Sequence, residues 1–185
     1  MCISHENAPL GSSVGTRRSR CAFTLIEILA VVVILAIAAL IAIPVFTGAS
    51  QIQVKAAADK LAADLEYAKS MAIANQRTHK VVFDAVQESY DIWAYDGLTS
   101  TWTLITDPVK KQADFRVTYP QESRLSKVRI TAADFNGTST VQFDYTGTPR
   151  DASGNALSTG TVALESQGMT LTISVEPVTG YISIQ

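Results

Sequence analysis

Cysteine and histidine are scarce in this sequence, which contains two of each. Cys2, Cys21 and His5 lie within the first 22 residues, so the rest of the sequence has no cysteine and a single histidine, His79. A disulfide framework needs paired cysteines, and a zinc site needs several Cys or His ligands. Both are therefore excluded beyond residue 22, and we expect His79 to be an ordinary strand or surface residue.

Charged residues are also few, at 17% of the chain against about 25% in soluble domains. The deficit is concentrated, because no Asp, Glu, Lys or Arg occurs between Ile28 and Val54. At a helical rise of about 1.5 Å per residue, this stretch can cross a hydrocarbon core of about 30 Å. The pattern predicts a transmembrane segment at residues 23–46, in contact with membrane lipid. Residues 1–22 form a hydrophilic leader that we exclude from the fold.

The charges that remain show no excess of basic residues outside the leader. The leader holds Arg17, Arg18 and Arg20 against Glu6, so the rest has 12 basic and 16 acidic residues. Basic residues before an apolar run place the leader in the cytoplasm and the remainder outside it. Nucleic-acid-binding proteins concentrate Lys and Arg on one face, so nucleic acid is not an expected partner. One basic stretch, which we interpret as solvated surface, contains Lys110, Lys111, Arg116, Arg124, Lys127 and Arg129.

Beyond Pro44 the pattern becomes amphipathic, with apolar residues spaced alternately by four and three positions. These residues are Val54, Ala58, Leu61, Leu65, Ala68 and Ala72. The spacing puts them on one face of a helix. We predict one long helix whose second half, residues 47–78, packs on a domain and ends near Asn75 to Thr78. Pro44 removes a helix hydrogen bond, so we expect a kink there.

From His79 onward the apolar period is two, which predicts β-strands between turn residues. The predicted strands are Lys80 to Phe83, Tyr90 to Tyr95, Trp102 to Ile105, Arg116 to Tyr119, Lys127 to Ile130, Thr140 to Tyr145, Gly160 to Glu165, Met169 to Val175 and Tyr181 to Ile184. The fold class is therefore α+β, with the helix laid against an antiparallel β-rich domain at residues 79–185.

The residues that join the leader to the apolar run form the most informative motif, RRSRCAFTLIE at positions 17–27. With Pro44 late in the apolar run, it resembles the N-terminus of type IV prepilins and pseudopilins, although Ala22 stands where Gly is usual. The resemblance implies a type IV pilin-like fold. It also implies that a prepilin peptidase cuts between Ala22 and Phe23 and methylates the new amine of Phe23. The expected location is the bacterial inner membrane, as a single-pass protein with a periplasmic C-terminal domain.

Glu27 is conspicuous on physical grounds as well. It lies one turn into a helix that enters lipid, where an unpaired carboxylate costs at least about 2.5 kcal/mol. The mature amine of Phe23 could compensate it, in the same chain or on a neighbouring helix, which assigns Glu27 to assembly. Alternatively, Glu27 reaches back to the cytoplasmic interface.

This terminus has three alternative interpretations. A secretory signal cut near Ala49 would need a shorter apolar core without Glu27. A lipoprotein anchored at Cys21 would have its apolar run before the cysteine. An unrelated single-pass membrane-anchored β domain stays open as an alternative.

The C-terminal half resembles the GspH/FimT group of minor pilins and pseudopilins. The resemblance rests on VQFDYTGTP at positions 141–149 and on TGYISI at positions 179–184. We interpret both segments as β turns between strands. Asp151, Ser153 and Asn155 have the alternating oxygen spacing of a calcium loop, but a simple turn is favoured.

Taken together, these features predict a structural subunit and not an enzyme. The sequence has no nucleophile–base pair, phosphate loop or metal cluster, so we expect no cofactor and no metal site. We predict a minor pilin or pseudopilin of a type II secretion system or type IV pilus. Its implied partners are the prepilin peptidase, other pilins of the filament and the inner-membrane assembly platform. A DNA-uptake minor pilin is the alternative, although residues 130–185 hold Arg150 alone against five acids.

Overall fold

The computed structural model describes residues 24–111 and 113–185, without the side chains of residues 40–49. The chain divides into two compact units, Met1–Ala42 and Ile43–Gln185. Ala22 and Phe23, the predicted processing site, lie outside the described residues.

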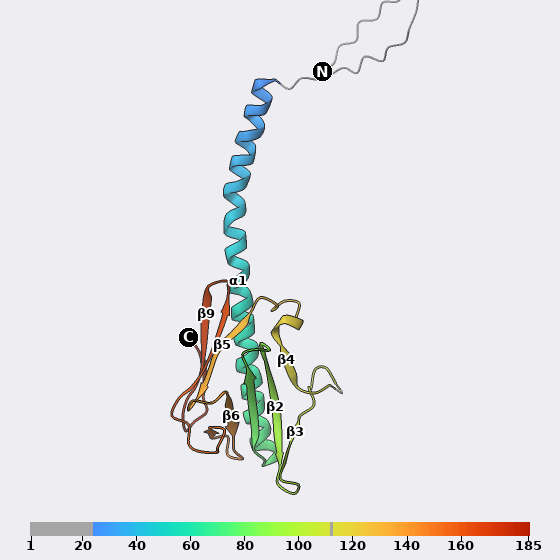
Figure 1. The fold of residues 1–185 in the computed structure, drawn as a ribbon, viewed down its shortest axis with the longest axis vertical. Coiled ribbons are helices and arrows are strands. Elements are labelled where there is room, and N and C mark those ends of the chain that lie inside the picture. The colour runs from blue at the N-terminus through green and yellow to red at the C-terminus, as the bar shows by residue number, and fades with distance from the viewer. Residues whose placement is uncertain (1–23, 112) are drawn as a thin grey trace, which may run out of the picture. The chain divides into compact units, whose positions relative to one another are not determined.

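A single helix, α1 (Leu25–Asn75), begins in the first unit and ends in the second (Figure 1). Its assignment continues through Pro44, and the predicted kink there stays a prediction. Within the residues that the structure describes, no helix is long and apolar enough to span a membrane. The transmembrane segment predicted at residues 23–46 includes residues outside that description and stays a prediction as well.

The second half of α1 has the predicted apolar face. All six residues of that face have no exposed surface: Val54, Ala58, Leu61, Leu65, Ala68 and Ala72. On a neighbouring face, Lys60 and Asp64 form an ion pair of 3.0 Å at the i,i+4 spacing that favours such pairs. The helix ends at Asn75, within the predicted range, and Gln76 takes a positive φ of 51°. Backbone bonds from Arg77 to Ala72 and from Gln76 to Ile73 then satisfy the last carbonyls, as in a Schellman motif.

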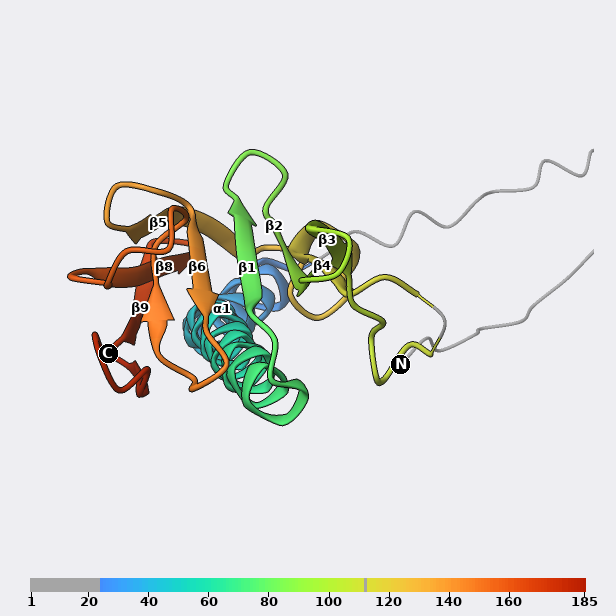
Figure 2. The same ribbon diagram turned by 90° about the horizontal axis from the view of Figure 1, so that it is seen from below.

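In the part of the chain that the structure describes, ten strands follow the helix and form two antiparallel sheets. The first sheet has the order β3-β2-β1-β6-β7, with β4 paired to β2, and the second has the order β10-β9-β8-β5. In the first sheet the strands are β1 (His79–Asp84), β2 (Ser89–Asp96), β3 (Thr101–Leu104), β4 (Arg116–Thr118), β6 (Thr140–Phe143) and β7 (Pro149–Arg150). In the second they are β5 (Arg129–Phe135), β8 (Gly160–Ser166), β9 (Met169–Val175) and β10 (Ile182–Ile184). A short 3₁₀ turn, Tyr119–Gln121, follows β4. In Figure 2, β6, β1 and β2 lie side by side across α1.

The predicted strands are present, with three differences larger than a shift of one residue at a strand end. β5 extends to Phe135, well beyond the predicted Ile130, because its Ala-containing end pairs with β8 despite low strand propensity. β6 stops at Phe143 because the residues after it form a turn. The two-residue strand β7, which follows that turn, was not predicted. Phe83 of β1 stacks on Phe135 of β5 with ring centres 5.6 Å apart, and this contact joins the cores of the two sheets.

Candidate functional site

The start of α1 shows how the residues after the predicted cut are organised. Thr24 precedes the helix, and the Glu27 N–H donates to both the Thr24 carbonyl, at 3.0 Å, and the Thr24 Oγ1, at 3.3 Å. Thr24 is thus the N-cap and Glu27 the third helical residue, which is the Thr-x-x-Glu spacing of a capping box. The Thr-x-x-Glu spacing is visible in the sequence. The role predicted for Glu27, however, rested only on the cost of a carboxylate in lipid and on the nearby amine of Phe23.

The Glu27 carboxylate lies in the first turn of the helix, where the partial positive charge of the helix end favours an anion. The residue is exposed in the first unit. Its carboxylate is therefore accessible to a cation from outside the chain. The assembly role of Glu27 and its pairing with Phe23 both stay predictions.

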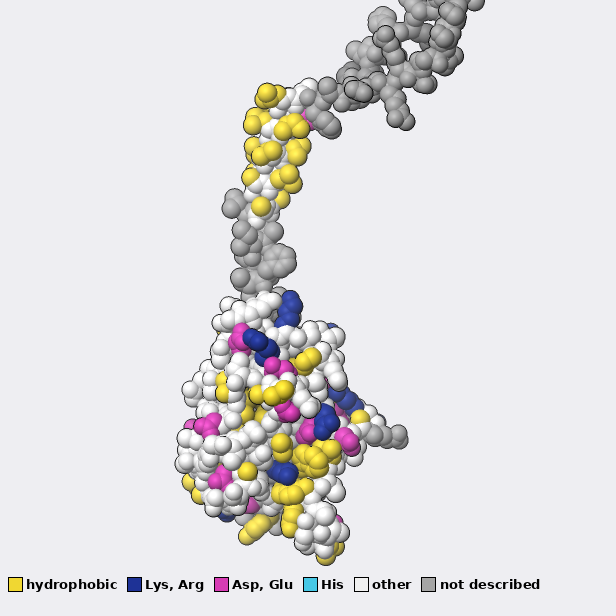
Figure 3. All heavy atoms as spheres, viewed as in Figure 1, with side chains coloured by type: hydrophobic (Ala, Val, Ile, Leu, Met, Phe, Trp, Pro, Cys, Tyr) yellow, Lys and Arg dark blue, Asp and Glu magenta, His cyan; other side chains and the backbone are white. Residues whose placement is uncertain are grey.

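The rest of this helical segment has no polar face. All described residues from 24 to 39 are exposed, and most are large and apolar (Figure 3). The large ones are Leu25, Ile26, Ile28, Leu29, Val31, Val32, Val33, Ile34, Leu35 and Ile37. A helix that is apolar all round needs an apolar environment or other helices to cover it. No titratable group other than Glu27 occurs in this described segment.

In the second unit, the two C-terminal turns of the sequence resemblance both meet α1. In the first turn, Asp144 Oδ1 accepts the N–H groups of Thr146 and Thr148 at 2.9 and 3.1 Å, and Oδ2 accepts Arg150 Nε at 2.9 Å. Burial opposes the charged form, but these bonds outweigh it and lower the pKa of Asp144. The prediction of a β turn here is confirmed.

Gly147 brings this turn against the helix. Its φ is +83°, and a Cβ at this position would lie 2.8 Å from Ile73 Cδ1. Gly180 of the second turn has a φ of +62°, and a Cβ there would lie 3.0 Å from the Gly147 carbonyl oxygen. Both positions therefore require glycine for conformation and for space.

Lys69 of α1 joins the two turns. Its Nζ donates to the Gly180 carbonyl at 3.0 Å and pairs with Glu66 at 2.8 Å. Its aliphatic stem passes 3.4 Å from the positions that a Cβ would take on Gly147 and on Gly180. The two motifs of the C-terminal half thus meet at one lysine of the helix, a residue that sequence reasoning missed because nothing in its own neighbourhood marks it.

Asp151 is the first residue of the possible calcium loop, and both of its carboxylate oxygens accept hydrogen bonds from other groups of the chain. Its Oδ1 accepts the N–H groups of Ser153 and Asn155 at 2.8 and 2.9 Å, and its Oδ2 accepts the side-chain amides of Asn136 and Asn155. Burial opposes the charged form, but these bonds outweigh it and lower the pKa of Asp151. The geometry is that of the favoured turn. Among the described residues, no three His, Cys, Asp or Glu side chains are grouped to hold a metal ion.

The basic stretch at 110–129 is partly neutralised. Three of its six cations form ion pairs, Lys110 with Glu122 at 3.0 Å, Arg116 with Asp91 at 2.7 Å and Arg129 with Glu165 at 2.8 Å. All three cations are about half exposed or more. This arrangement matches the predicted solvated surface and differs from the concentrated basic face of a nucleic-acid binder.

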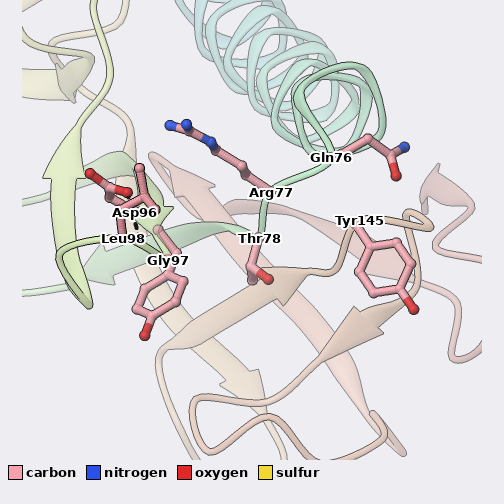
Figure 4. Close-up of a pocket in the computed structure, with 8 residues that line it drawn as sticks. Gln76, Arg77, Thr78, Asp96, Gly97, Leu98 and Tyr145 are labelled. Atoms are coloured by element: carbon pink, nitrogen blue, oxygen red, sulfur yellow. Dashed lines mark hydrogen bonds between the residues drawn. The ribbon is translucent and has the colours of Figure 1, made fainter.

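A hollow of about 340 Å³ lies at the C-terminal end of α1. Gln76, Arg77 and Thr78 line it from the helix end, and residues 95–98 and Tyr145 line it from the sheet (Figure 4). Hydrogen bonds from the loop, chiefly the Leu98 N–H, lower the pKa of Asp96. The lining residues include no nucleophile with an adjacent base.

Comparison with known proteins places these features in context. Residues 57–179 match the family model for type II transport protein GspH, and residues 17–43 match the prokaryotic N-terminal methylation motif. Among solved structures, the chain is similar to the minor pseudopilin EpsH of the Vibrio cholerae type II secretion system. The TM-score is 0.53 with 9% identity, over 72% of this chain and 96% of EpsH.

The type IV minor pilin FimU of Pseudomonas aeruginosa is 18% identical over 73% of this chain and 90% of FimU, with a TM-score of 0.46. A search of curated proteins found no match. The similarity to EpsH, at this level of identity, is one of fold, and it confirms the predicted α+β, type IV pilin-like architecture.

Proposed function

The chain belongs to the GspH family of type II transport proteins, and from this premise we propose that it is a minor structural subunit of a pilus-like filament. The filament is a type II secretion pseudopilus or a type IV pilus. In this function α1 is the assembly element, and the β-rich domain faces other subunits and cargo.

One observation carries the proposal: a helical segment that is apolar all round directly precedes a helical segment with a single buried face. The first segment has no cover among the described residues of its own unit, so its partners are lipid before assembly and neighbouring helices afterwards. The second segment is covered by the strands of its own chain. This division suits a subunit that is held in a membrane and then packed into a helical bundle.

Further steps follow from the methylation motif. A prepilin peptidase cuts between Ala22 and Phe23 on the cytoplasmic side of the inner membrane and methylates the Phe23 amine. Cutting places an amine four residues before Glu27, and the carboxylate of one chain then meets the amine of its neighbour. In low dielectric this charge-assisted contact is strengthened, so it helps to set the position of each subunit in the filament.

The intact mass of the membrane-extracted protein tests the processing step. We expect a chain that begins at N-methylated Phe23, and we expect Ala22→Leu to block the cut because a bulky residue replaces a small one. As a control, Ala30→Leu also enlarges an alanine near the start of the run but leaves the cleavage site intact, and it should be processed normally. A chain that begins near Ser50, or that stays uncut in cells with the peptidase, would contradict the assignment.

A further inference from the structure

The outward side of the first sheet carries a cluster that the proposed function does not explain. Lys80, Trp93 and Leu104 are directly opposite one another across β1, β2 and β3, and Tyr95 is opposite Trp102 in the next row. We call these five residues the aromatic face. Their neighbours along the strands, such as Val81 and Ile92, are buried in the core, so alternation directs the aromatic face away from α1.

This face is unusually apolar for a solvated surface. It holds both tryptophans of the chain, and all five of its residues are partly exposed. Figure 3 shows hydrophobic side chains gathered over β2 and β3, with a basic side chain among them. The adjoining β2–β3 turn adds Leu98, which is 92% exposed. Large aromatic side chains on the outer side of a sheet that already covers a core are typical of an interface.

The face also presents one cation that lacks an acceptor among the described residues. Lys80 Nζ lies 4.1 Å from the centre of the Trp102 ring and 5.6 Å from that of Trp93. In the described part of the chain it makes no ion pair or hydrogen bond, and burial lowers the pKa of its ammonium group. The indole Nε1 of Trp93 is buried and has no acceptor among the described residues either.

The acids nearby are engaged elsewhere. On β2, Asp91 pairs with Arg116, and Asp96 accepts the Leu98 N–H at 2.9 Å. A cation set among apolar rings, with no acid paired to it among the described residues, therefore offers a site for one acceptor of opposite charge, a carboxylate. An ammonium that is already partly desolvated gains more from such a partner than a fully hydrated lysine does.

We propose that the aromatic face is a docking surface for a neighbouring subunit of the same filament, which presents a carboxylate between apolar side chains. This inference rests on the proposed function. A glycan fits less well, because Lys80 covers the ring of Trp102, and the rings of Trp102 and Tyr95 are inclined by 54° and form no flat platform. Aromatic anchors around a buried charge are instead characteristic of protein interfaces.

Photo-cross-linking of the full chain in its own bacterium tests the proposal. The probe is p-benzoylphenylalanine in place of Tyr95, with the same replacement at Tyr181, 63% exposed and just before β10, as the matched control. We expect at least about fivefold more adduct at position 95. The cross-linked peptide should come from another protein with an N-terminal methylation motif and should contain Asp or Glu beside apolar residues. Equal yields at both positions, adducts with a second copy of this chain or with secreted cargo, or a peptide without an acid would overturn the proposal.

Charge reversal provides an independent readout. Lys80→Glu should lower the cross-linking yield at position 95 about tenfold, and the reciprocal change of the partner's acid to Lys should restore it. Lys127→Glu, the same change at an exposed lysine outside the face, should leave the yield unaltered. An unchanged yield in Lys80→Glu would overturn the proposal even if position 95 cross-links. If the yield is unchanged in Lys80→Glu but the protein is processed and enters filaments normally, the docking surface is contradicted and the proposed function stands. If the unmodified chain does not enter filaments, the proposed function itself is contradicted.

Discussion

The two halves of α1 differ in where their apolar side chains find cover. From Leu25 to Ile37 the large apolar residues are at least 48% exposed, whereas from Val54 to Ala72 the buried face has no exposed surface. Uniform apolarity leaves a helix without a preferred side, and no described residue of its own unit covers it. A single apolar stripe selects one side, and the strands of the same chain fill it. In the proposed function, one helix thus serves assembly with its first segment and folding with its second.

The largest effect should come from the only charge in the described part of the first segment. Glu27→Ala and Glu27→Gln should both be processed and remain in the membrane, because loss of a carboxylate favours the apolar phase. Their recovery in sheared or cross-linked filament fractions should fall at least about tenfold, since a charged hydrogen bond contributes about 1.5 to 3 kcal/mol. Asp59→Ala, at an exposed acid of the second segment, is the control. Wild-type recovery of both Glu27 variants would mean that helix packing alone drives assembly.

Substitutions on the buried face of the second half of α1 should have a large effect on stability. A chain truncated to begin at Gln51 should fold as a soluble helix-and-sheet monomer, because its strands already cover the apolar stripe. In it, Leu61→Ala and Leu65→Ala should each lower the free energy of unfolding by about 2 to 5 kcal/mol, measured by urea denaturation. The same change at Leu98, which is 92% exposed, should cost less than about 0.5 kcal/mol. Equal costs at the three leucines would remove the distinction between covered and uncovered surface.

A smaller effect tests how closely the turns cover the end of the helix. Gly147→Ala and Gly168→Ala share a positive φ, of +83° and +85°, and so share a strain of about 1 to 2 kcal/mol. Only Gly147 faces Ile73, whereas nothing lies within 4 Å of a Cβ at Gly168. Gly147→Ala should therefore cost about 1 kcal/mol more, measured in the same truncated chain. Adding Ile73→Val, which removes the Cδ1 methyl group, should reduce this difference, and persistence of the full difference would show that the contact does not cause it.

The smallest effect concerns pH at the end of the covered segment. His79 is buried, and although its Nδ1–H donates to the Arg77 carbonyl at 3.0 Å, burial lowers its pKa below 6.5. The unfolded chain thus binds a proton at higher pH than the folded chain, so stability should decline as pH falls below about 6.5. Asp144, Asp151 and Glu165 have lowered pKa values too, but their contribution is lost only in the acid range. Urea midpoints between pH 7.5 and 5.5 should decline less in His79→Gln, and identical slopes would contradict the prediction.

Local periodicity predicted most of the architecture. The spacing of Leu61 and Leu65 identified the buried face, because a helix converts sequence spacing directly into a spatial stripe. The division into two sheets was not predictable, since alternation assigns residues to opposite sides without choosing strand partners. For the same reason the strand pattern could not place Trp93, Trp102 and Lys80 together, a grouping that depends on the register of three strands.

The residues of the candidate site also divide into those that the sequence could identify and those whose contacts it could not predict. Glu27 could be identified from its chemistry in an apolar run, and the role of Thr24 as its cap was present in the local spacing. Gly147 and Gly180 were recognised as turn residues, but their meeting at Lys69 depends on packing between distant segments. Nothing near Lys69 in the sequence distinguishes it from the other lysines of the helix.

The bond from Lys69 to Gly180 joins residues 111 positions apart. During synthesis Lys69 is made 111 residues before Gly180, so this contact forms only after strands β1 to β9 have been made. Formation of such long-range contacts is slow, because the ends of a long loop must meet before any contact stabilises them. Closure of the second turn onto the helix is therefore a late event in folding. Until this turn closes, the part of the helix near Lys69 lacks some of its cover, and an incompletely folded chain would expose apolar surface that promotes aggregation.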